Sequence, residues 1–341
     1  MIWREAEGCR VVDGDGRRLL DLSGGFGVAA LGHRNPEVWA AVEAQAARCV
    51  HALGDLAEAD VSAELRRRLG LGGHVAKLGI TGEDAVEIAL RTALLVTGRS
   101  GIVAFEGAYH GTGLLSLAAT GFERFREPFA PWLPGPVHRY AYGVDPGPLP
   151  EDAACVIVEP VQGRAGARVP PDDFLEQLRA RCDETGALLV ADEIYCGLGR
   201  TGALWRNAGL ADLVTTGKAL GGGLPISACL MQPEHADAWP GGPEDVYTHT
   251  HTGTPLAAAA ALVVLDRVPA LLARVRAAGE RFEAAGWHGA GLMRARPGEA
   301  FEAYRRGVIV VPAGEDGSLI SATPPLTITD EEIDEALEAL A

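Results

Sequence analysis

The stretch Thr215-Thr216-Gly217-Lys218-Ala219-Leu220-Gly221-Gly222-Gly223 joins a strand-like run, residues 212–215, to a glycine triplet. Its single lysine, Lys218, has only small neighbours, and the glycines allow backbone or ligand to come close. Partial desolvation lowers the pKa of a lysine and frees the lone pair of its amine. Lys218 is therefore a candidate Schiff-base nucleophile. From this stretch alone, a lysine in an ordinary turn after a strand is an equally good interpretation.

The composition of the 341-residue chain limits its function classes. Hydrophobic residues make up 48%, which is enough for a large core, and the length suits one large domain with a smaller one. The net charge of −16 argues against binding nucleic acid or an anionic membrane surface. No transmembrane segment is expected, because the apolar run 257–264 is followed by Asp266 and Arg267. We see no signal peptide, so we expect a cytoplasmic protein.

The cysteines and histidines do not indicate a metal site. The six cysteines are scattered, without Cys-x-x-Cys spacing, and several lie in apolar runs. They are expected to be reduced thiols in the core or near the site. His249 and His251 have no third ligand at a suitable spacing, so we expect no bound metal.

Apolar strand-like runs alternate with helical segments along the chain. Because residues 127–150 are rich in proline and glycine and have no clear period, they are expected to form a loop. The expected strands are residues 101–105, 154–158, 187–191, 212–215 and 226–231, and the expected helices begin near 36, 81, 170, 256 and 329.

The turn Thr81-Gly82-Glu83 precedes one of these helices. The first N–H groups of a helix have no internal partner and lie at the positive end of its dipole, so this turn is a possible anion site. A plain capped helix explains the same residues, since Thr81 suits the cap and Glu83 the first turn.

Two side chains follow strand-like runs at the edge where α/β proteins bind ligands. Tyr109 follows 101–105 and is either a ring that stacks on a flat ligand or a packing aromatic under a loop. Asp192 follows the continuous apolar run 187–191, which is typical of a central parallel strand. A carboxylate there is costly unless it is paired, which favours a functional Asp192.

Together these features suit one kind of ligand. A helix start can hold a phosphate, an aromatic ring can stack, an acid lies at a strand end and a lysine can form a Schiff base. Pyridoxal 5'-phosphate (PLP) would use all four, because an acid keeps its ring nitrogen protonated and the ring accepts electrons from a carbanion.

The chain resembles the class III (ornithine/GABA-type) aminotransferases of PLP fold type I, over nearly its whole length and in order. The matching stretches are Val12-Asp13-Gly14-Asp15-Gly16, Leu31-Gly32-His33, Thr81-Gly82-Glu83-Asp84-Ala85-Val86-Glu87, Tyr109-His110-Gly111, Glu159-Pro160-Val161-Gln162-Gly163, Asp192-Glu193-Ile194, Gly197-Leu198-Gly199-Arg200-Thr201-Gly202, the stretch around Lys218 and Pro324-Pro325-Leu326-Thr327-Ile328-Thr329.

The resemblance implies a fold and a domain organisation. It implies an α/β protein with a mostly parallel central sheet flanked by helices and a small α+β domain. Residues 40–260 would form the large PLP-binding domain. Residues 1–39 together with 261–341 would form the small domain, which is abbreviated between 286 and 307.

The resemblance also implies roles for single residues. Lys218 would carry the Schiff base and move the proton, and Asp192 would pair with the pyridinium nitrogen. Thr250 would reach the phosphate of the other subunit, which implies a homodimer with shared active sites. The rest of the implied cofactor shell is Thr81, Gly82, Glu83, Tyr109, His110 and Tyr195.

The chain departs from the family pattern at three positions. Tyr195 stands where the family has a glutamine that contacts the cofactor's phenolic oxygen, and a tyrosine hydroxyl can do the same. Ser321 stands where the family often has an arginine that binds the substrate α-carboxylate. Arg164 replaces the glutamate that masks that arginine. Either Arg164 supplies the positive charge, or the substrate presents another anionic group, or Arg164 points to solvent.

The expected function is PLP-dependent transfer of an amino group between an amino acid or amine donor and a carbonyl acceptor. An epimerase, racemase or decarboxylase on the same fold is an alternative, because these reactions share the same carbanion chemistry. A non-catalytic protein on this fold is a second alternative, but it would be expected to have lost Lys218 or Asp192, and both are present.

Overall fold

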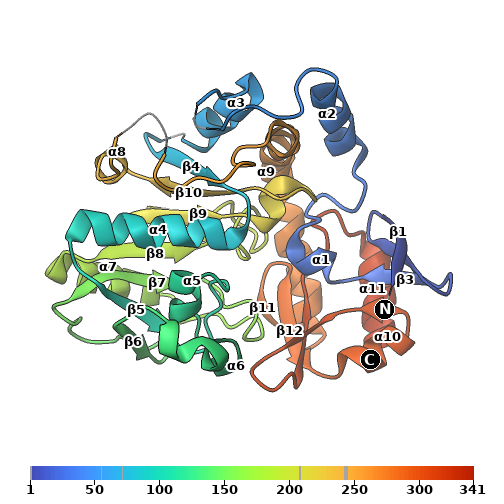
Figure 1. Ribbon diagram of the computed structural model, residues 1–341. Coiled ribbons are helices and arrows are strands. Elements are labelled where there is room, and N and C mark those ends of the chain that lie inside the picture. The colour runs from blue at the N-terminus through green and yellow to red at the C-terminus, as the bar shows by residue number, and fades with distance from the viewer. Residues whose placement is uncertain (1, 55, 71, 207–208, 242–244) are drawn as a thin grey trace.

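The computed structural model describes residues 2–341 except 55, 71, 207–208 and 242–244. A seven-stranded sheet forms its centre, in the order β4-β10-β9-β8-β7-β5-β6 (Figure 1). Its strands are β4 (Val75–Gly79), β5 (Gly101–Phe105), β6 (Val137–Tyr140), β7 (Ala153–Val158), β8 (Leu188–Asp192), β9 (Leu213–Thr216) and β10 (Ser227–Met231).

Six of the seven strands run in one direction. Strands β9, β8, β7, β5 and β6 pair in parallel, and β10 is antiparallel to both of its neighbours, β9 and β4. Strands β4, β5, β7, β8 and β9 therefore end at the same edge of the sheet. The loops after these five ends meet there, as expected for a ligand site in an α/β fold.

The central strands are apolar runs because both faces of the sheet are covered. Along β5, Ile102 and Ala104 pack into the cluster that contains the apolar side of α4 (Gly82–Thr97). Val103 and Phe105 pack into the opposite cluster with α7 (Phe174–Thr185). The alternation of side chains along a strand sends neighbouring residues to opposite faces. The expected α/β fold with helices on both faces is confirmed.

Two smaller four-stranded sheets lie beside the central one. The first combines β1 (Trp3–Glu7), β2 (Arg10–Asp13) and β3 (Arg18–Asp21) with β13 (Val308–Ile309), so segments from both ends of the chain share it. The two termini accordingly lie close together in Figure 1. The domain boundaries near residues 40 and 260 stay a prediction. The second sheet is antiparallel, in the order β11 (His288–Ala290), β12 (Met293–Pro297), β15 (Leu319–Ala322) and β14 (Val311–Ala313).

The long helix α9 (Pro255–Ala284) packs against α2 (Pro36–Ala46), α3 (Asp60–Leu69) and η2 (Lys218–Gly221). In the described part of the chain it is the one helix long and apolar enough to cross a membrane by length and composition. Asp266 and Arg267 interrupt the apolar run in the sequence, which predicts no such segment, but the helix continues through them. Core helices of soluble proteins pass the same test, and Val264, Val268 and Phe282 of α9 are fully buried.

The remaining helices are short or peripheral. They are α1 (Gly24–Gly27), α2 (Pro36–Ala46), α3 (Asp60–Leu69), α5 (Leu114–Ala119), α6 (Glu123–Arg126), α8 (Pro233–Ala236), α10 (Ala300–Arg305), α11 (Asp330–Leu340) and the 3-10 turns η1 (Glu127–Trp132) and η2 (Lys218–Gly221).

The expectation of a loop over 127–150 is wrong in part. This region holds η1 and the edge strand β6, which pairs in parallel with β5. The strand was hidden because it is short, half-buried and carries His138 and Arg139 in place of an apolar run. Edge strands commonly have such a composition.

Candidate active site

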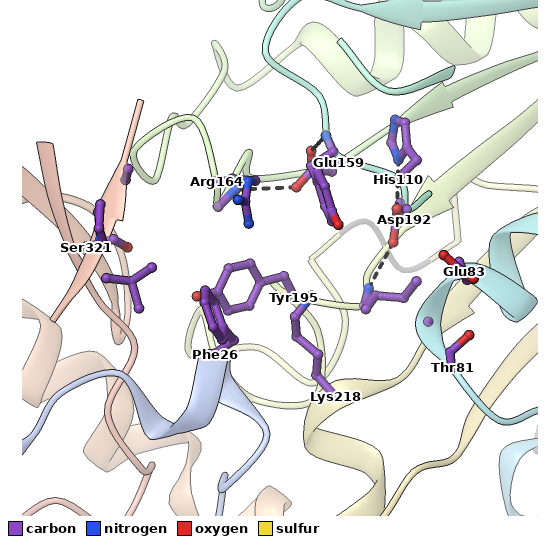
Figure 2. A pocket seen from close by; sticks show the side chains of 18 residues that line it. Phe26, Thr81, Glu83, His110, Glu159, Arg164, Asp192, Tyr195, Lys218 and Ser321 are labelled. Carbon is purple, nitrogen blue, oxygen red and sulfur yellow. Dashed lines mark hydrogen bonds and ion pairs between the residues drawn. The ribbon is translucent and has the colours of Figure 1, made fainter. Parts of the chain in front are cut away.

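The five strand ends at one edge of the sheet surround a cavity of about 490 Å³. Most of its lining follows from the topology: Thr81 comes after β4, Tyr109 after β5, Glu159 after β7 and Lys218 after β9, while Asp192 ends β8. Figure 2 shows Thr81 and Glu83 on one side of the cavity and Arg164 and Ser321 on the other. The full lining is Phe26, Thr81, Gly82, Glu83, Tyr109, His110, Gly111, Glu159, Gly163, Arg164, Asp192, Ile194, Tyr195, Lys218, Val311, Pro312, Ala313 and Ser321.

Lys218 begins η2 directly after β9. Its φ of 37° lies in the left-handed region, which costs about 1–3 kcal/mol for a residue other than glycine and is commonly found at functional sites. Its Nζ lies 4.4 Å from the centroid of the Tyr195 ring and forms no ion pair within the described residues. Burial lowers the pKa of Lys218 below 10.5, although the charges of Asp192 and Glu159 act in the opposite direction. Burial of Lys218 thus shifts its equilibrium toward the neutral amine.

Asp192 ends β8 and is buried. Its Oδ1 accepts hydrogen bonds from the Thr215 hydroxyl at 3.0 Å and from the Ile194 N–H at 3.2 Å. Its Oδ2 lies 2.7 Å from Nδ1 of the buried His110. These partners stabilise the carboxylate in a place where an unpaired charge would be costly.

Glu159 is a second buried acid in the cavity, and it is not among the site residues predicted from the sequence. Parallel pairing of Val158 with Ala191 places Glu159 and Asp192 on adjacent strand ends. Burial, together with the charge of Asp192, raises the pKa of Glu159 to about 7. Its Oε1 accepts a hydrogen bond from the Tyr109 N–H at 2.8 Å. The signal that would have found it is an acid directly after an apolar strand, as for Asp192.

The start of α4 forms the opposite wall. The Thr81 hydroxyl accepts a hydrogen bond from the Asp84 N–H at 3.3 Å, and the Asp84 carboxylate accepts one from the Thr81 N–H at 2.9 Å. This capping box orients the first turn and leaves the N–H groups of Gly82 and Glu83 for another acceptor. The Glu83 carboxylate is turned aside, where it accepts hydrogen bonds from Thr112. A phosphate fits this turn.

Arg164 lies on two aromatic rings at the other side of the cavity. Its guanidinium carbon is 4.8 Å from the Tyr109 ring centroid and 5.0 Å from that of Phe125, and the two rings contact each other edge to face. Within the described residues no acid forms an ion pair with Arg164. Ser321 on β15 is buried, and its Oγ has no hydrogen-bond partner there.

Two predicted site residues are placed differently from the rest. The Tyr195 hydroxyl lies 3.1 Å from the Thr323 hydroxyl, so the ring face is what this side chain presents to Lys218. Thr250 does not line the cavity; it is exposed in the loop before α9. The structure brings the other predicted residues together in one cavity.

Comparison with known proteins identifies relatives with the same fold. Residues 1–285 match the family model for class III aminotransferases. The chain is 36% identical to acetylornithine aminotransferase of Methanopyrus kandleri, over 98% of this chain and 92% of the relative. It is 33% identical to a 5-aminovalerate aminotransferase of Pseudomonas aeruginosa, over 100% and 92%. A solved amine transaminase from an uncultivated Pseudomonas species, in a PLP-bound form, superimposes with a TM-score of 0.90 at 28% identity, covering 100% and 93%.

The cavity fits the cofactor that this comparison indicates. An amine without an acid partner, a buried and hydrogen-bonded carboxylate, and free N–H groups at a helix start occupy three parts of one cavity. PLP has an aldehyde, a ring nitrogen and a phosphate that match them. PLP is the cofactor of this enzyme, and the chain belongs to the class III aminotransferases of PLP fold type I.

Proposed function

We propose that this enzyme transfers the amino group of a donor that also carries a carboxylate, and that Arg164 binds this carboxylate. The observation that supports the proposal is the position of Arg164. Its guanidinium faces the same cavity as Lys218, and no acid in the described structure neutralises it. A buried or half-buried cation without a partner is costly, and a substrate carboxylate would supply that partner.

Lys218 would hold and move the proton of the reaction. Bound PLP supplies an electron-withdrawing ring that accepts the electron pair when the substrate loses its proton. Burial lowers the pKa of Lys218, which favours the neutral amine that can act as a base. The Tyr195 ring below Nζ limits where the lysine side chain can lie.

Other residues of the cavity would hold the cofactor. Asp192, which is held in place by Thr215 and His110, would bind the protonated ring nitrogen. The N–H groups of Gly82 and Glu83 would bind the phosphate, with the Thr81 hydroxyl orienting the turn. The ring of Tyr109 would lie against the cofactor.

The exposed loop position of Thr250 supports a shared active site. A side chain that does not line its own cavity can serve the cavity of a neighbouring subunit. We therefore propose a homodimer in which Thr250 of each subunit hydrogen-bonds the phosphate bound by the other.

Arg164 is preorganised to bind a carboxylate in place of the arginine that Ser321 replaces. The Tyr109 and Phe125 rings contact the guanidinium and limit its motion, which lowers the entropy cost of binding. A serine offers one hydroxyl and no charge, so Ser321 is not a substitute for a bidentate cationic clamp. Arg164 would bind the carboxylate, and Ser321 would add one hydrogen bond to the substrate.

The names of the relatives support a class of donor. Acetylornithine and 5-aminovalerate each combine a primary amine at the end of an aliphatic chain with a carboxylate several bonds away. We propose donors of this kind, ω-amino carboxylates, for this enzyme.

A half-reaction without acceptor tests the proposed transfer. The holoenzyme is mixed with 5-aminovalerate, and the pyridoxal absorbance band is followed. We expect it to be replaced by the pyridoxamine band and to return when a carbonyl acceptor is added. An unchanged pyridoxal band, with exchange of the donor's amine-bearing C–H for deuterium, would instead indicate epimerase-type chemistry and contradict the proposal.

A further inference from the structure

A second cavity, of about 320 Å³, lies at the edge of the central sheet. Its lining residues come from β6, α5, α6, η1 and the two residues that follow η1, Leu133 and Pro134. Figure 1 labels β6, α5 and α6 in this part of the molecule. Arg126, at the end of α6, and Arg139, on β6, both line it. It shares no lining residue with the active-site cavity.

Several nitrogens of the two arginines have no partner among the described residues. Arg139 donates a hydrogen bond to the carbonyl oxygen of Ala118, but its Nη1 is shielded from water and has no hydrogen-bond partner there. Nε of Arg126 is likewise shielded and has no partner within that part of the chain. In the described structure neither guanidinium forms an ion pair with an acid. Burial and the nearby charge of Arg126 together lower the pKa of Arg139 to about 10.

Two acids, Glu123 and Glu127, also line this cavity. Both are exposed, and among the described residues neither forms an ion pair with Arg126 or Arg139. Two like charges that are partly removed from water repel each other and are poorly solvated. Such an arrangement is stabilised when an anion lies between the guanidinium groups.

The wall of the cavity adds a second chemical requirement. Ala118, Leu133 and Val137 contribute apolar surface beside the two guanidinium groups. The volume is at the lower end of the range for sites that bind small metabolites. A ligand that suits both parts has an anionic head and an apolar body.

We propose that this cavity is a binding site for a small organic anion, whose carboxylate or phosphate group lies between Arg126 and Arg139 and whose apolar part contacts Leu133 and Val137. The site goes beyond the proposed function, because its occupation does not depend on which donor the enzyme uses.

Isothermal titration of the PLP-loaded enzyme with two probes, phenyl phosphate and benzoate, tests the proposal. We expect saturable binding of one molecule per chain, with a Kd at or below about 1 mM for at least one probe. Tighter binding of phenyl phosphate would identify a phosphate site, and tighter binding of benzoate a carboxylate site. Failure of both probes to bind would overturn the proposal.

Variants separate this site from the active site. Arg126→Gln is the main variant, because the described structure gives the Arg126 side chain no ion pair and leaves its buried Nε unpartnered. We expect it, and Arg139→Gln, to weaken probe binding about tenfold or more. Arg164→Ala is expected to leave probe binding unchanged. If Arg164→Ala abolished binding while Arg126→Gln did not, the probe would be in the active site and the proposal would be wrong.

The stability of the Arg126→Gln variant gives an independent readout. Without probe, we expect its Tm to equal or exceed that of the unaltered enzyme, because the charge repulsion between Arg126 and Arg139 is removed. We expect the probe to raise the Tm of the unaltered enzyme and to leave that of the Arg126→Gln variant unchanged. A clear fall in Tm without probe would mean that the charge of Arg126 is compensated inside the protein, which contradicts the proposed site.

Discussion

The imidazole Nδ1 of His110 lies 2.7 Å from Oδ2 of Asp192, and both side chains are buried at the carboxyl edge of the central sheet. The Thr215 hydroxyl, 3.0 Å from Oδ1, provides a second partner. The acid proposed to bind the cofactor's ring nitrogen is thus fixed from two sides, by residues of β9 and of the loop after β5. Its function depends on neighbours that do not themselves react.

The Thr215 hydrogen bond predicts the effect of Thr215→Val. A hydrogen bond to a charged group contributes about 1.5–3 kcal/mol, so we expect kcat/KM to fall about tenfold or more. Thr216→Val is the matched control: Thr216 is also buried on β9, but its hydroxyl has no partner within the described residues. Steady-state kinetics of both variants measures these changes in kcat/KM. Equal decreases in kcat/KM for the two variants would show that the hydrogen bond from Thr215 to Asp192 is not needed for activity.

The raised pKa of Glu159 leads us to expect that stability depends on pH. Its pKa is raised from 4.5 to about 7, so between these values the folded protein binds more protons than the unfolded chain. Stability therefore falls as pH rises from about 4.5 to 7, by about 3 kcal/mol for this group. Glu159→Gln should remove this dependence and be more stable than the unaltered enzyme at pH 8, but not at pH 4.5. Urea unfolding at both pH values measures this.

The control for Glu159→Gln is Glu176→Gln, which changes an exposed carboxylate on α7. We expect it to leave the pH dependence as it is. If Glu159→Gln were less stable than the unaltered enzyme at pH 8, burial of the charged carboxylate would not be the dominant effect.

Gly163 allows the Tyr195 ring to lie beside Lys218. A Cβ on Gly163 would come within 2.4 Å of Cδ1 of that ring, so the tyrosine would have to move. We expect Gly163→Ala to lower stability by about 1–3 kcal/mol and to reduce kcat, because the ring also contacts Nζ of Lys218. At Gly241 a Cβ would meet nothing within 4 Å, so Gly241→Ala should change neither quantity. Thermal unfolding and kinetics of both variants test this.

The shared active site predicts complementation between two defective subunits. Thr250→Val should raise the Kd for PLP about tenfold or more, because a hydrogen bond to a charged phosphate is lost. In a heterodimer of a Lys218→Ala chain with a Thr250→Val chain, one site then has an intact lysine and the intact threonine of its neighbour. That site should bind PLP as tightly as in the unaltered enzyme. Weakened binding in this site would show that Thr250 serves its own chain.

Most of the strand ends can be predicted from the sequence, because buried parallel strands consist of continuous runs of apolar residues. The acid or lysine after such a run is visible as a break in composition, which is how Asp192 and Lys218 were found. Strand β6 was not found, because an edge strand needs no such run. Glu159 was not named because its importance comes from the pairing of Val158 with Ala191, which local sequence does not contain.

The contacts of the Arg164 side chain also could not be predicted from the sequence. Phe125 lies 39 positions before Arg164, on α6, and contacts it only because the chain folds. Arg164 lines the cavity, and its guanidinium lies on the Tyr109 ring. That it supplies the positive charge for a substrate carboxylate stays a prediction. The Arg126 and Arg139 pair is likewise visible only once β6 and α6 are placed.

The central claim, that Arg164 binds the substrate carboxylate, is tested most directly by Arg164→Ala with paired donors. 5-Aminovalerate carries a carboxylate, and pentylamine has a similar chain without one. Arg124→Ala is the control, because Arg124 also contacts the Phe125 ring but does not line the cavity. We predict that Arg164→Ala lowers kcat/KM for 5-aminovalerate about tenfold or more. We predict that it lowers kcat/KM for pentylamine less than about twofold. A fall of less than about twofold for 5-aminovalerate, or equal falls for both donors, would contradict the claim.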